Sequence, residues 1–431
     1  MLHSKFFETE NFIYFFTTSL YLIFFFNLTI NDGSDSSLLK FFAFLAILLF
    51  FIRKIKFSTN LYFILITITP FVFISLNEII LNKDIIPSTQ LAWFSYTSKI
   101  YKSQFIYTLF FLFLPSLILN TKFSSEVFFK IININIIISI SFNFYINFNF
   151  NFNRDLIAKE LNPVILYDYS LIAISLLTLC YGFYKNNKTA YIFISLSLIN
   201  ILLICLHGSR GSWLGIPISF LIIFSFFYKK CFFKILTILS VSLLLIVVAL
   251  MIPNNPIQKR LQEFKSDEYN ITHNQNYNSS VGTRLSLWKL SLEKFKEAPI
   301  TGIGIVEFKE DICELNQQGK IGECTIHAHN IFFQVLATHG LLGLLALLIL
   351  IILPIQFFIQ SLRKNSDNEE IRLLCCAGIS FIVYITICGL TDFYFYAPRQ
   401  TILYYLVIFT LMSLIIKIHQ RESSIFFAES K

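Results

Sequence analysis

Charged side chains are scarce in this sequence, and their scarcity excludes a soluble globular protein. Only 14% of the 431 residues are Asp, Glu, Lys or Arg, whereas 55% are hydrophobic and 51 are phenylalanine. One soluble core could not bury so much apolar material. The few charges lie in short clusters between long apolar runs, which indicates an all-α protein that crosses a membrane many times.

The sequence also contains no glycine-rich phosphate loop, no internal repeat and no basic segment interleaved with aromatic residues. The net charge of +8 therefore does not indicate nucleic-acid binding, because the Lys and Arg residues flank apolar runs, as topogenic charges do. The first apolar segment, Phe12 to Ile30, lacks a small-residue cleavage site and is expected to be retained as a membrane helix.

Apolar runs of roughly 20 residues, the length of one membrane crossing, occur about twelve times. One of them contains Asn133 and Asn135, whose amides need hydrogen-bond partners inside the helix bundle. The predicted helices span residues 11–30, 38–52, 60–77, 103–119, 127–147, 162–183, 188–206, 213–228, 232–252, 330–358, 371–391 and 400–418.

Lysine and arginine mark alternate loops and so predict the orientation of the chain. Basic residues cluster around 53–56 and 229–234, which we assign to the cytoplasm together with both termini. The long polar segment 253–329 then faces outward. This divides the chain into nine helices in residues 1–252, a large loop in 253–329, and three helices with a cytoplasmic tail in 330–431.

The large loop is expected to form a small, partly helical lid. Thr283 can cap a helix that runs from Arg284 to Lys296, with apolar residues at helical spacing along one face. Cys313 and Cys324 both lie in this loop, and a disulfide between them is expected if the compartment is oxidising.

His327 and His329 stand where the large loop meets the next apolar run. If a helix begins near Asn330, His329 lies beside unpaired N–H groups and the positive end of the helix dipole, which keep an imidazole neutral and able to accept a proton. The same helix end attracts anions. Both histidines could equally be caps at a membrane interface. Gly340 and Gly343 share one face of this helix and allow close packing against a neighbour.

Two arginines are placed where they could bind an anion. Arg210 lies in a very short outer hairpin between Gly208 and Gly211, and an arginine there can hold a phosphate bidentately. Arg284 lies in the first turn of the loop helix, where a cation is slightly unfavourable for the helix itself. A snorkelling arginine and a solvated surface arginine are the alternatives.

Other polar residues have two interpretations each. Asp392 and Arg399 bracket the last outer loop and could pair with each other or with substrate. Asp168, inside a predicted helix, could be a proton-relay residue of a transporter or a satisfied structural group.

A zinc site built from Cys313, Cys324, His327 and His329 is conceivable but not favoured. His-x-His at a helix start is expected to point its rings in different directions, and the cysteine spacing fits no common zinc finger. We therefore expect no metal.

Three motifs in this order resemble the O-antigen ligase and polymerase superfamily of bacterial inner-membrane glycosyltransferases. The family's histidine signature is similar to the segment that has His329-Asn330, nine further residues and then Gly340-Leu-Leu-Gly343. One difference is Leu344, because threonine often follows in the family. The other two are the Ser209-Arg210-Gly211 turn, and Gly282-Thr283-Arg284 followed by a Trp-bearing helix and a Gly302-x-Gly304 turn.

The resemblance implies a fold related to C-type glycosyltransferases and a site that works without metal or cofactor. The donor would be a glycan on undecaprenyl pyrophosphate, held by Arg210 and Arg284, and His329 would take the proton from the acceptor hydroxyl. The large loop would be periplasmic and the other partners membrane lipids.

The implied acceptor is the lipid A core, as in a ligase, which the histidine signature and the modest chain length favour. A second glycan repeat unit (polymerase) or a protein hydroxyl (O-oligosaccharyltransferase) are alternatives within the superfamily. A transporter or flippase of lipid-linked glycans is the alternative from another class, but its polar residues would line the bundle interior.

Overall fold

The computed structural model describes residues 2–31, 35–52, 54–56, 58–81, 110–251 and 279–429, together with a few residues between 262 and 273. Within these ranges every regular element is a helix, and 7 helices are long and apolar enough to cross a membrane. The prediction of an all-α polytopic membrane protein is therefore confirmed. The predicted number of helices is not tested, because residues 82–109, where the fourth helix was expected to begin, lie outside the described part.

The helices follow the predicted ranges closely in most of the chain. Besides an apolar helix at Phe110–Leu119, they are α1 (Leu2–Ile30), α2 (Asp35–Phe51), α3 (Leu61–Leu81), α5 (Ser125–Asn149), α6 (Arg154–Glu160), α7 (Val164–Tyr184), α8 (Thr189–Cys205), α9 (Arg210–Trp213), α10 (Gly215–Met251), α12 (Ser280–Glu297), α13 (Ile305–Gln317), α14 (Ile331–Lys364), α15 (Glu369–Cys388), the 3-10 helix η1 (Tyr394–Tyr396) and α16 (Pro398–Glu429).

One predicted loop is wrong. Residues 213–228 and 232–252 were expected to be separate helices, but Gly215–Met251 is a single helical element, α10. The expected break at Lys229-Lys230 contains neither glycine nor proline, so no residue there ends the helix. The side chains of these two lysines lie outside the described residues.

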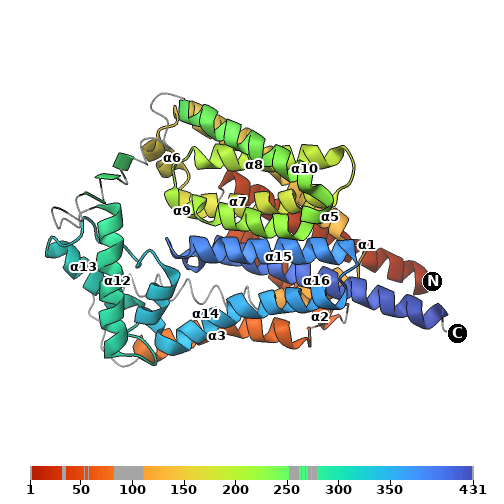
Figure 1. The fold of residues 1–431 in the computed structure, drawn as a ribbon. Helices are drawn as coiled ribbons and strands as arrows, with labels where there is room; N and C mark the ends of the chain where they lie inside the picture. The colour runs from red at the N-terminus through yellow and green to blue at the C-terminus, as the bar shows by residue number, and fades with distance from the viewer. Residues whose placement is uncertain are drawn as a thin grey trace.

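The helices form a bundle whose two ends differ (Figure 1). Both termini lie at one end, and α6, α9, α12 and α13 lie at the other, where α14 begins. Within the bundle α7 is central, since 94% of its apolar window is buried. The polar loop and the termini thus occupy opposite ends of the bundle, which agrees with the predicted arrangement, although the side of the membrane on which each lies is not tested.

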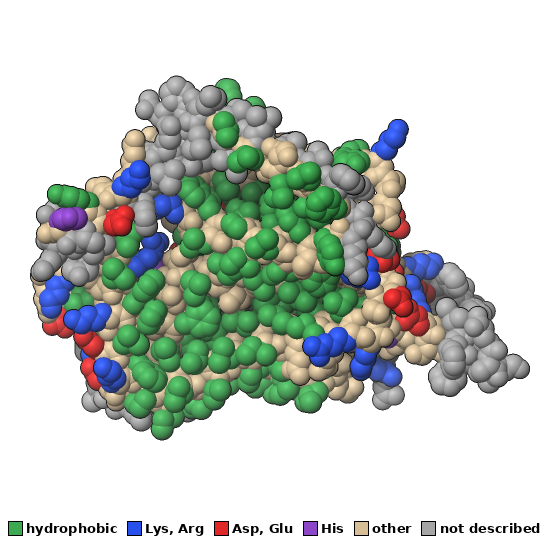
Figure 2. Space-filling model, viewed as in Figure 1, with side chains coloured by type: hydrophobic (Ala, Val, Ile, Leu, Met, Phe, Trp, Pro, Cys, Tyr) green, Lys and Arg blue, Asp and Glu red, His purple; other side chains and the backbone are tan. Residues whose placement is uncertain are grey.

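On the face that Figure 2 shows, a belt of apolar side chains covers the middle of the bundle, and charged side chains gather toward its two ends. Large apolar residues in the spanning helices are exposed on the surface, among them Phe15 at 70% and Leu221 at 67%. Water would disfavour so many exposed apolar groups, whereas lipid tails accommodate them. The belt therefore marks the part of the protein that contacts the membrane.

A turn of the large loop is inserted into a break in α14. The break is at Gly340, where φ is 60° and ψ is −153°. In the turn, the Ile303 N–H donates to Ala337 O of α14 at 2.9 Å. The Pro299 carbonyl of the turn accepts from the Leu341 N–H of α14 at 2.9 Å. Backbone groups that a broken membrane helix would leave unpaired are thereby satisfied.

The expected role of Gly340 and Gly343 in packing against a neighbouring helix is therefore corrected. A Cβ on Gly340 would lie 2.5 Å from the carbonyl carbon of Ile300, so the close neighbour is the loop turn. A Cβ on Gly343 would lie 2.2 Å from the Cβ of His339, one turn earlier on the same helix. The two glycines serve the break in α14 and its docked turn.

Replacing Gly340 with alanine is expected to destabilise the protein by about 3 kcal/mol, because the new methyl group clashes with the turn and the positive φ strains an alanine. Gly319→Ala is the matched control: Gly319 also has a positive φ, of 70°, but a Cβ there meets nothing within 4 Å. Thermal unfolding in detergent should show a much larger drop in Tm for Gly340→Ala. Equal drops would show that the docked turn contributes nothing.

Candidate active site

The two histidines lie in a turn that is fixed by both neighbouring helices. His329 has a φ of 49°, so the chain reverses direction between the large loop and α14. Between the histidines, Ala328 is fully buried. Its N–H donates to Gln334 Oε1 of α14 at 2.8 Å, and its carbonyl accepts from Trp288 Nε1 of α12 at 3.1 Å. The turn is thus held by the membrane helix on one side and by the lid on the other.

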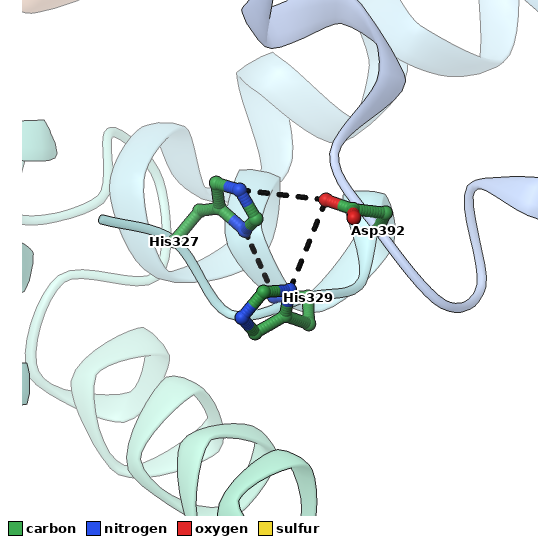
Figure 3. A group of neighbouring side chains, drawn as sticks. All are labelled: His327, His329 and Asp392. Carbon is green, nitrogen blue, oxygen red and sulfur yellow. Dashed lines mark hydrogen bonds and ion pairs between the residues drawn. The ribbon is translucent and has the colours of Figure 1, made fainter. Parts of the chain in front are cut away.

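Both imidazole rings face one carboxylate, that of Asp392 in the loop between α15 and α16 (Figure 3). Asp392 Oδ1 lies 3.4 Å from His327 Nε2 and 3.8 Å from His329 Nδ1. The expectation that His-x-His points its rings apart is therefore wrong, and the positive φ at His329 is the reason. Asp392 was expected only to pair with Arg399 or with substrate, whereas Arg399 donates to Asn31 Oδ1.

The hydrogen bonds of His327 define its protonation state. Its Nδ1 accepts from the backbone N–H of His329 at 3.2 Å, so the proton of the neutral ring is on Nε2, which faces Asp392. Burial lowers the pKa of His327 to about 4, despite the opposing effect of Asp392. Burial raises the pKa of the Asp392 carboxyl, but the two histidines and the Phe393 N–H outweigh that effect and lower it to about 2. A neutral His327 and a charged Asp392 are the resting forms.

His329 is the more accessible of the two histidines. Its side chain is 25% exposed, whereas that of His327 is 11% exposed. Its Nδ1 has no hydrogen-bond partner in the described part of the chain, and the nearest acceptor is Asp392. A proton on Nδ1 is therefore directed toward the carboxylate, which leaves the Nε2 lone pair available to take a proton from a bound molecule.

The start of α14 is not the anion site that we expected. Asn330 caps the helix, and its side chain accepts from the N–H groups of Phe332 and Phe333 at 2.9 and 3.2 Å. The N–H of Ile331 donates to Gly389 O at 2.7 Å. These first N–H groups are occupied, so an anion near His329 must be held by side chains.

Arg284 projects from the first turns of α12 close to the histidine turn. One guanidinium nitrogen, Nη1, donates to Ser280 Oγ at 3.2 Å, while the buried Nε has no hydrogen-bond partner in the ranges described. Burial is the main cause of the lowered pKa of His327, and the positive charge of Arg284 acts in the same direction. A cation with an unsatisfied buried N–H beside a neutral histidine is suited to bind an anionic group.

Arg210 lies in a turn that touches the loop of Asp392. Gly211 approaches that loop so closely that a Cβ would lie 2.5 Å from both Thr391 Oγ1 and the Tyr169 hydroxyl. These two oxygens are themselves hydrogen-bonded at 2.8 Å. Three segments that are distant in sequence, carrying Arg210, Asp392 and the histidines, therefore meet at the end of the bundle where the lid lies.

Sequence analysis missed the partner of Asp168. The imidazole Nδ1 of His207 lies 2.7 Å from Asp168 Oδ1, and both side chains are fully buried. Of the two interpretations, this contact favours a structural group, in which Asp168 Oδ1 is paired while Asp168 Oδ2 has no hydrogen-bond partner among the described residues. The position of His207 directly before the Arg210 hairpin was a signal, but no spacing rule pairs residues 39 positions apart.

The lid contains a disulfide between Cys313 of α13 and Cys324, with Cα atoms 4.6 Å apart, which is the expected pairing. It removes both thiolates from the zinc site considered above. His327, His329 and Asp392 still bring three possible ligand atoms within 4.8 Å of one another, so these residues could hold a metal ion. The expectation of a metal-free site stays a prediction.

Comparisons with known proteins match parts of this chain to a family model and to a relative. Residues 172–348 match the model of a family described as O-Antigen ligase. A Haemophilus influenzae protein described as an uncharacterized protein is 31% identical over 205 residues, or 46% of this chain. That match spans half, 50%, of the relative's length. The part of the chain that is similar to the O-antigen ligase family, residues 172–348, carries Arg210, Arg284 and His329.

Proposed function

We propose that this protein is a membrane glycosyltransferase of the ligase type, which transfers a glycan from undecaprenyl pyrophosphate to a hydroxyl of the lipid A core. The proposed location is the periplasmic face of the bacterial inner membrane, with both termini in the cytoplasm. One observation carries the proposal: Asp392, neutral His327 and accessible His329 meet beside Arg284 at one end of an apolar bundle. A lipid-linked pyrophosphate presents its head group at the membrane surface, where the end of an apolar bundle is expected to lie.

In the proposed reaction, the acceptor hydroxyl attacks the anomeric carbon of the donor sugar while His329 Nε2 takes its proton. The bond between that carbon and the pyrophosphate oxygen breaks, and the leaving undecaprenyl pyrophosphate retains the bonding electrons. Arg210 and Arg284 stabilise the charge that develops on it. Asp392 stabilises the imidazolium that forms at His329. A direct displacement of this kind inverts the anomeric configuration.

The lid is suited to exclude water from this reaction. Trp288 of α12 stacks on Phe333 of α14 with ring centroids 5.2 Å apart and also holds the Ala328 carbonyl. These contacts fix α12, which carries Arg284, against the histidine turn that α14 also holds. With α12 in this position, the base and the Arg284 cation face the donor together.

Two further acceptors remain as alternatives, a second repeat unit and a protein hydroxyl. A transporter of lipid-linked glycans is less well supported. Its ionisable residues would line a path through the bundle, whereas His329 contacts Asp392 directly before α14, and α12, which carries Arg284, lies at the end of the bundle where α14 begins (Figure 1). Asp168 and His207 are buried within the bundle but contact each other directly.

Substituting Arg284 with glutamine is expected to raise the KM for the donor by roughly 10- to 100-fold, the effect of losing one charge-assisted hydrogen bond to a phosphate. Arg210→Gln should act in the same way. Lys289→Gln removes a positive charge from the exposed face of the same helix as Arg284 and is the matched control. A donor KM that rises equally in all three variants would indicate nonspecific attraction and would remove both arginines from the site.

The experiment that tests the proposal uses purified protein in lipid nanodiscs with an undecaprenyl-pyrophosphate glycan as donor. Lipid A core, a free repeat unit and an acceptor protein are offered in turn, each with and without EDTA. We expect transfer to lipid A core that EDTA does not reduce. Transfer to another acceptor alone would replace the ligase assignment, and loss of activity with EDTA that added metal restores would overturn the metal-free mechanism.

A further inference from the structure

Helix α7 carries two polar side chains that take no part in the proposed chemistry yet contact two parts of the site. Asp168 and Tyr169 follow one another on this central helix, and both are fully buried. Burying such groups in the middle of a membrane bundle is costly unless their hydrogen bonds serve the fold or the site. Each residue contacts a segment that is distant in sequence.

Asp168 holds the base of the Arg210 turn. Its partner His207 is the second residue after the end of α8, and the 2.7 Å contact fixes that residue against α7. Gly208 then turns the chain with a φ of 76°, and Arg210 begins α9. On the far side of this turn, Tyr384 of α15 donates to Ser212 O at 3.0 Å. The turn is therefore fixed before and after Arg210.

Tyr169 joins that turn to the Asp392 loop. Its hydroxyl lies 2.8 Å from Thr391 Oγ1, and Gly211 packs against both oxygens. Thr391 also donates to Cys388 O at 3.0 Å, which fixes the residue directly before Asp392 to the end of α15. The hydroxyl of Tyr169 is thus shared between the segment that carries an anion-binding arginine and the segment that orients His329.

We propose that Asp168, His207 and Tyr169 are positioning residues, of which the first two place Arg210 and the third places Arg210 and Asp392 together. This inference rests on the proposed transfer reaction. Among the described residues, no protein group continues a proton path from Asp168 and His207, because His207 Nε2 and Asp168 Oδ2 are buried with no hydrogen-bond partner there.

The two kinds of contact predict different kinetics. His207→Ala frees only the Arg210 turn, so the donor KM should rise about tenfold while kcat changes less than about twofold. Tyr169→Phe loosens both segments and should raise the donor KM and also lower kcat about tenfold. His207→Asn keeps an amide N–H near the position of Nδ1 and should restore the KM.

Tyr21→Phe is the matched control for Tyr169→Phe. Tyr21 is also a fully buried tyrosine whose hydroxyl contacts a threonine, Thr410, but that threonine lies in α16 and not in a loop of the site. The control should leave both kinetic constants unchanged. If it lowers kcat as much as Tyr169→Phe does, or if His207→Asn is as impaired as His207→Ala, the positioning role is overturned.

Hydrogen–deuterium exchange separates failure of this inference from failure of the proposed function. In nanodiscs without substrate, Tyr169→Phe should increase exchange in peptides covering 206–214 and 389–397, and His207→Ala in 206–214 alone. Unchanged exchange in these peptides would refute the positioning role whatever the protein catalyses. The wild-type protein could also transfer no glycan while the variants show the increased exchange. That result would refute the proposed function and support the positioning role.

Discussion

Replacing His329 with alanine is expected to lower the rate of glycan transfer at least 100-fold, within the range of roughly 10²–10⁴ that a positioned base contributes. The variant loses the one accessible imidazole of the cluster, and His327 cannot replace it because its Nδ1 is occupied by a backbone N–H and its Nε2 faces Asp392. The rate is measured at saturating donor and acceptor, with the amount of folded protein determined by size-exclusion chromatography.

His273→Ala is the control for this experiment, because His273 is an exposed histidine of the same loop whose ring stacks on that of Tyr269. It should transfer glycan at the wild-type rate. A His329→Ala protein that retains most of its activity would show that another group takes the proton, and the mechanism would have to be abandoned.

Replacing Asp392 with asparagine is expected to lower kcat about 100-fold while changing the donor KM only slightly. The amide cannot stabilise the imidazolium that forms at His329, and it can present an N–H to a ring nitrogen that itself carries a proton. In the proposed mechanism the arginines hold the donor, and this substitution does not alter them.

The pH dependence follows from the pKa of Asp392, which is lowered to about 2 in the folded protein. A lowered carboxyl pKa favours the folded protein above the unfolded value of about 3.9, and this stabilisation is lost as the pH falls toward 2. The wild-type carboxylate is therefore charged throughout the pH range 5–8, so Asp392→Asn should lower kcat across the whole of it. Asp311→Asn, in the lid, is the control, because Asp311 pairs with Lys294. A defect that disappears at one end of the range would contradict the assigned charge.

The fold could be predicted from the sequence wherever apolar length alone decides the structure. A run such as Val164–Tyr184 must be helical in lipid, because its backbone groups can be satisfied only within the segment. The prediction of a break between two helices inside α10 was wrong for a related reason. A pair of lysines marks a change in hydropathy, but it does not end a helix.

The residues of the candidate site could be selected one by one from the sequence, but their arrangement could not be predicted. Each of them lies at or next to the end of a predicted helix, where a polar residue is easily recognised in the sequence. These residues are Arg210, Arg284 and His329. The direction of the histidine rings depends on a positive φ that His329 adopts because its neighbours Ala328 and Gln334 hold the turn. No local pattern predicts that conformation.

Contacts between distant segments were the other limit. Asp392 lies in the loop after α15, and its proximity to the histidines depends on how α14 and α15 pack. The docking of the Pro299 turn into the break at Gly340 joins two motifs that sequence presents separately. In both cases tertiary packing, which a single sequence does not reveal, decides the geometry.

A single-turnover experiment tests most directly the central claim that His329 is the base. Protein in nanodiscs is loaded with undecaprenyl-pyrophosphate glycan, lipid A core is added, and the release of undecaprenyl pyrophosphate is followed in wild type and in His329→Ala. Both proteins should bind the donor equally, and only the wild type should release the lipid and glycosylate the core rapidly. Release at the same rate from His329→Ala would contradict the claim.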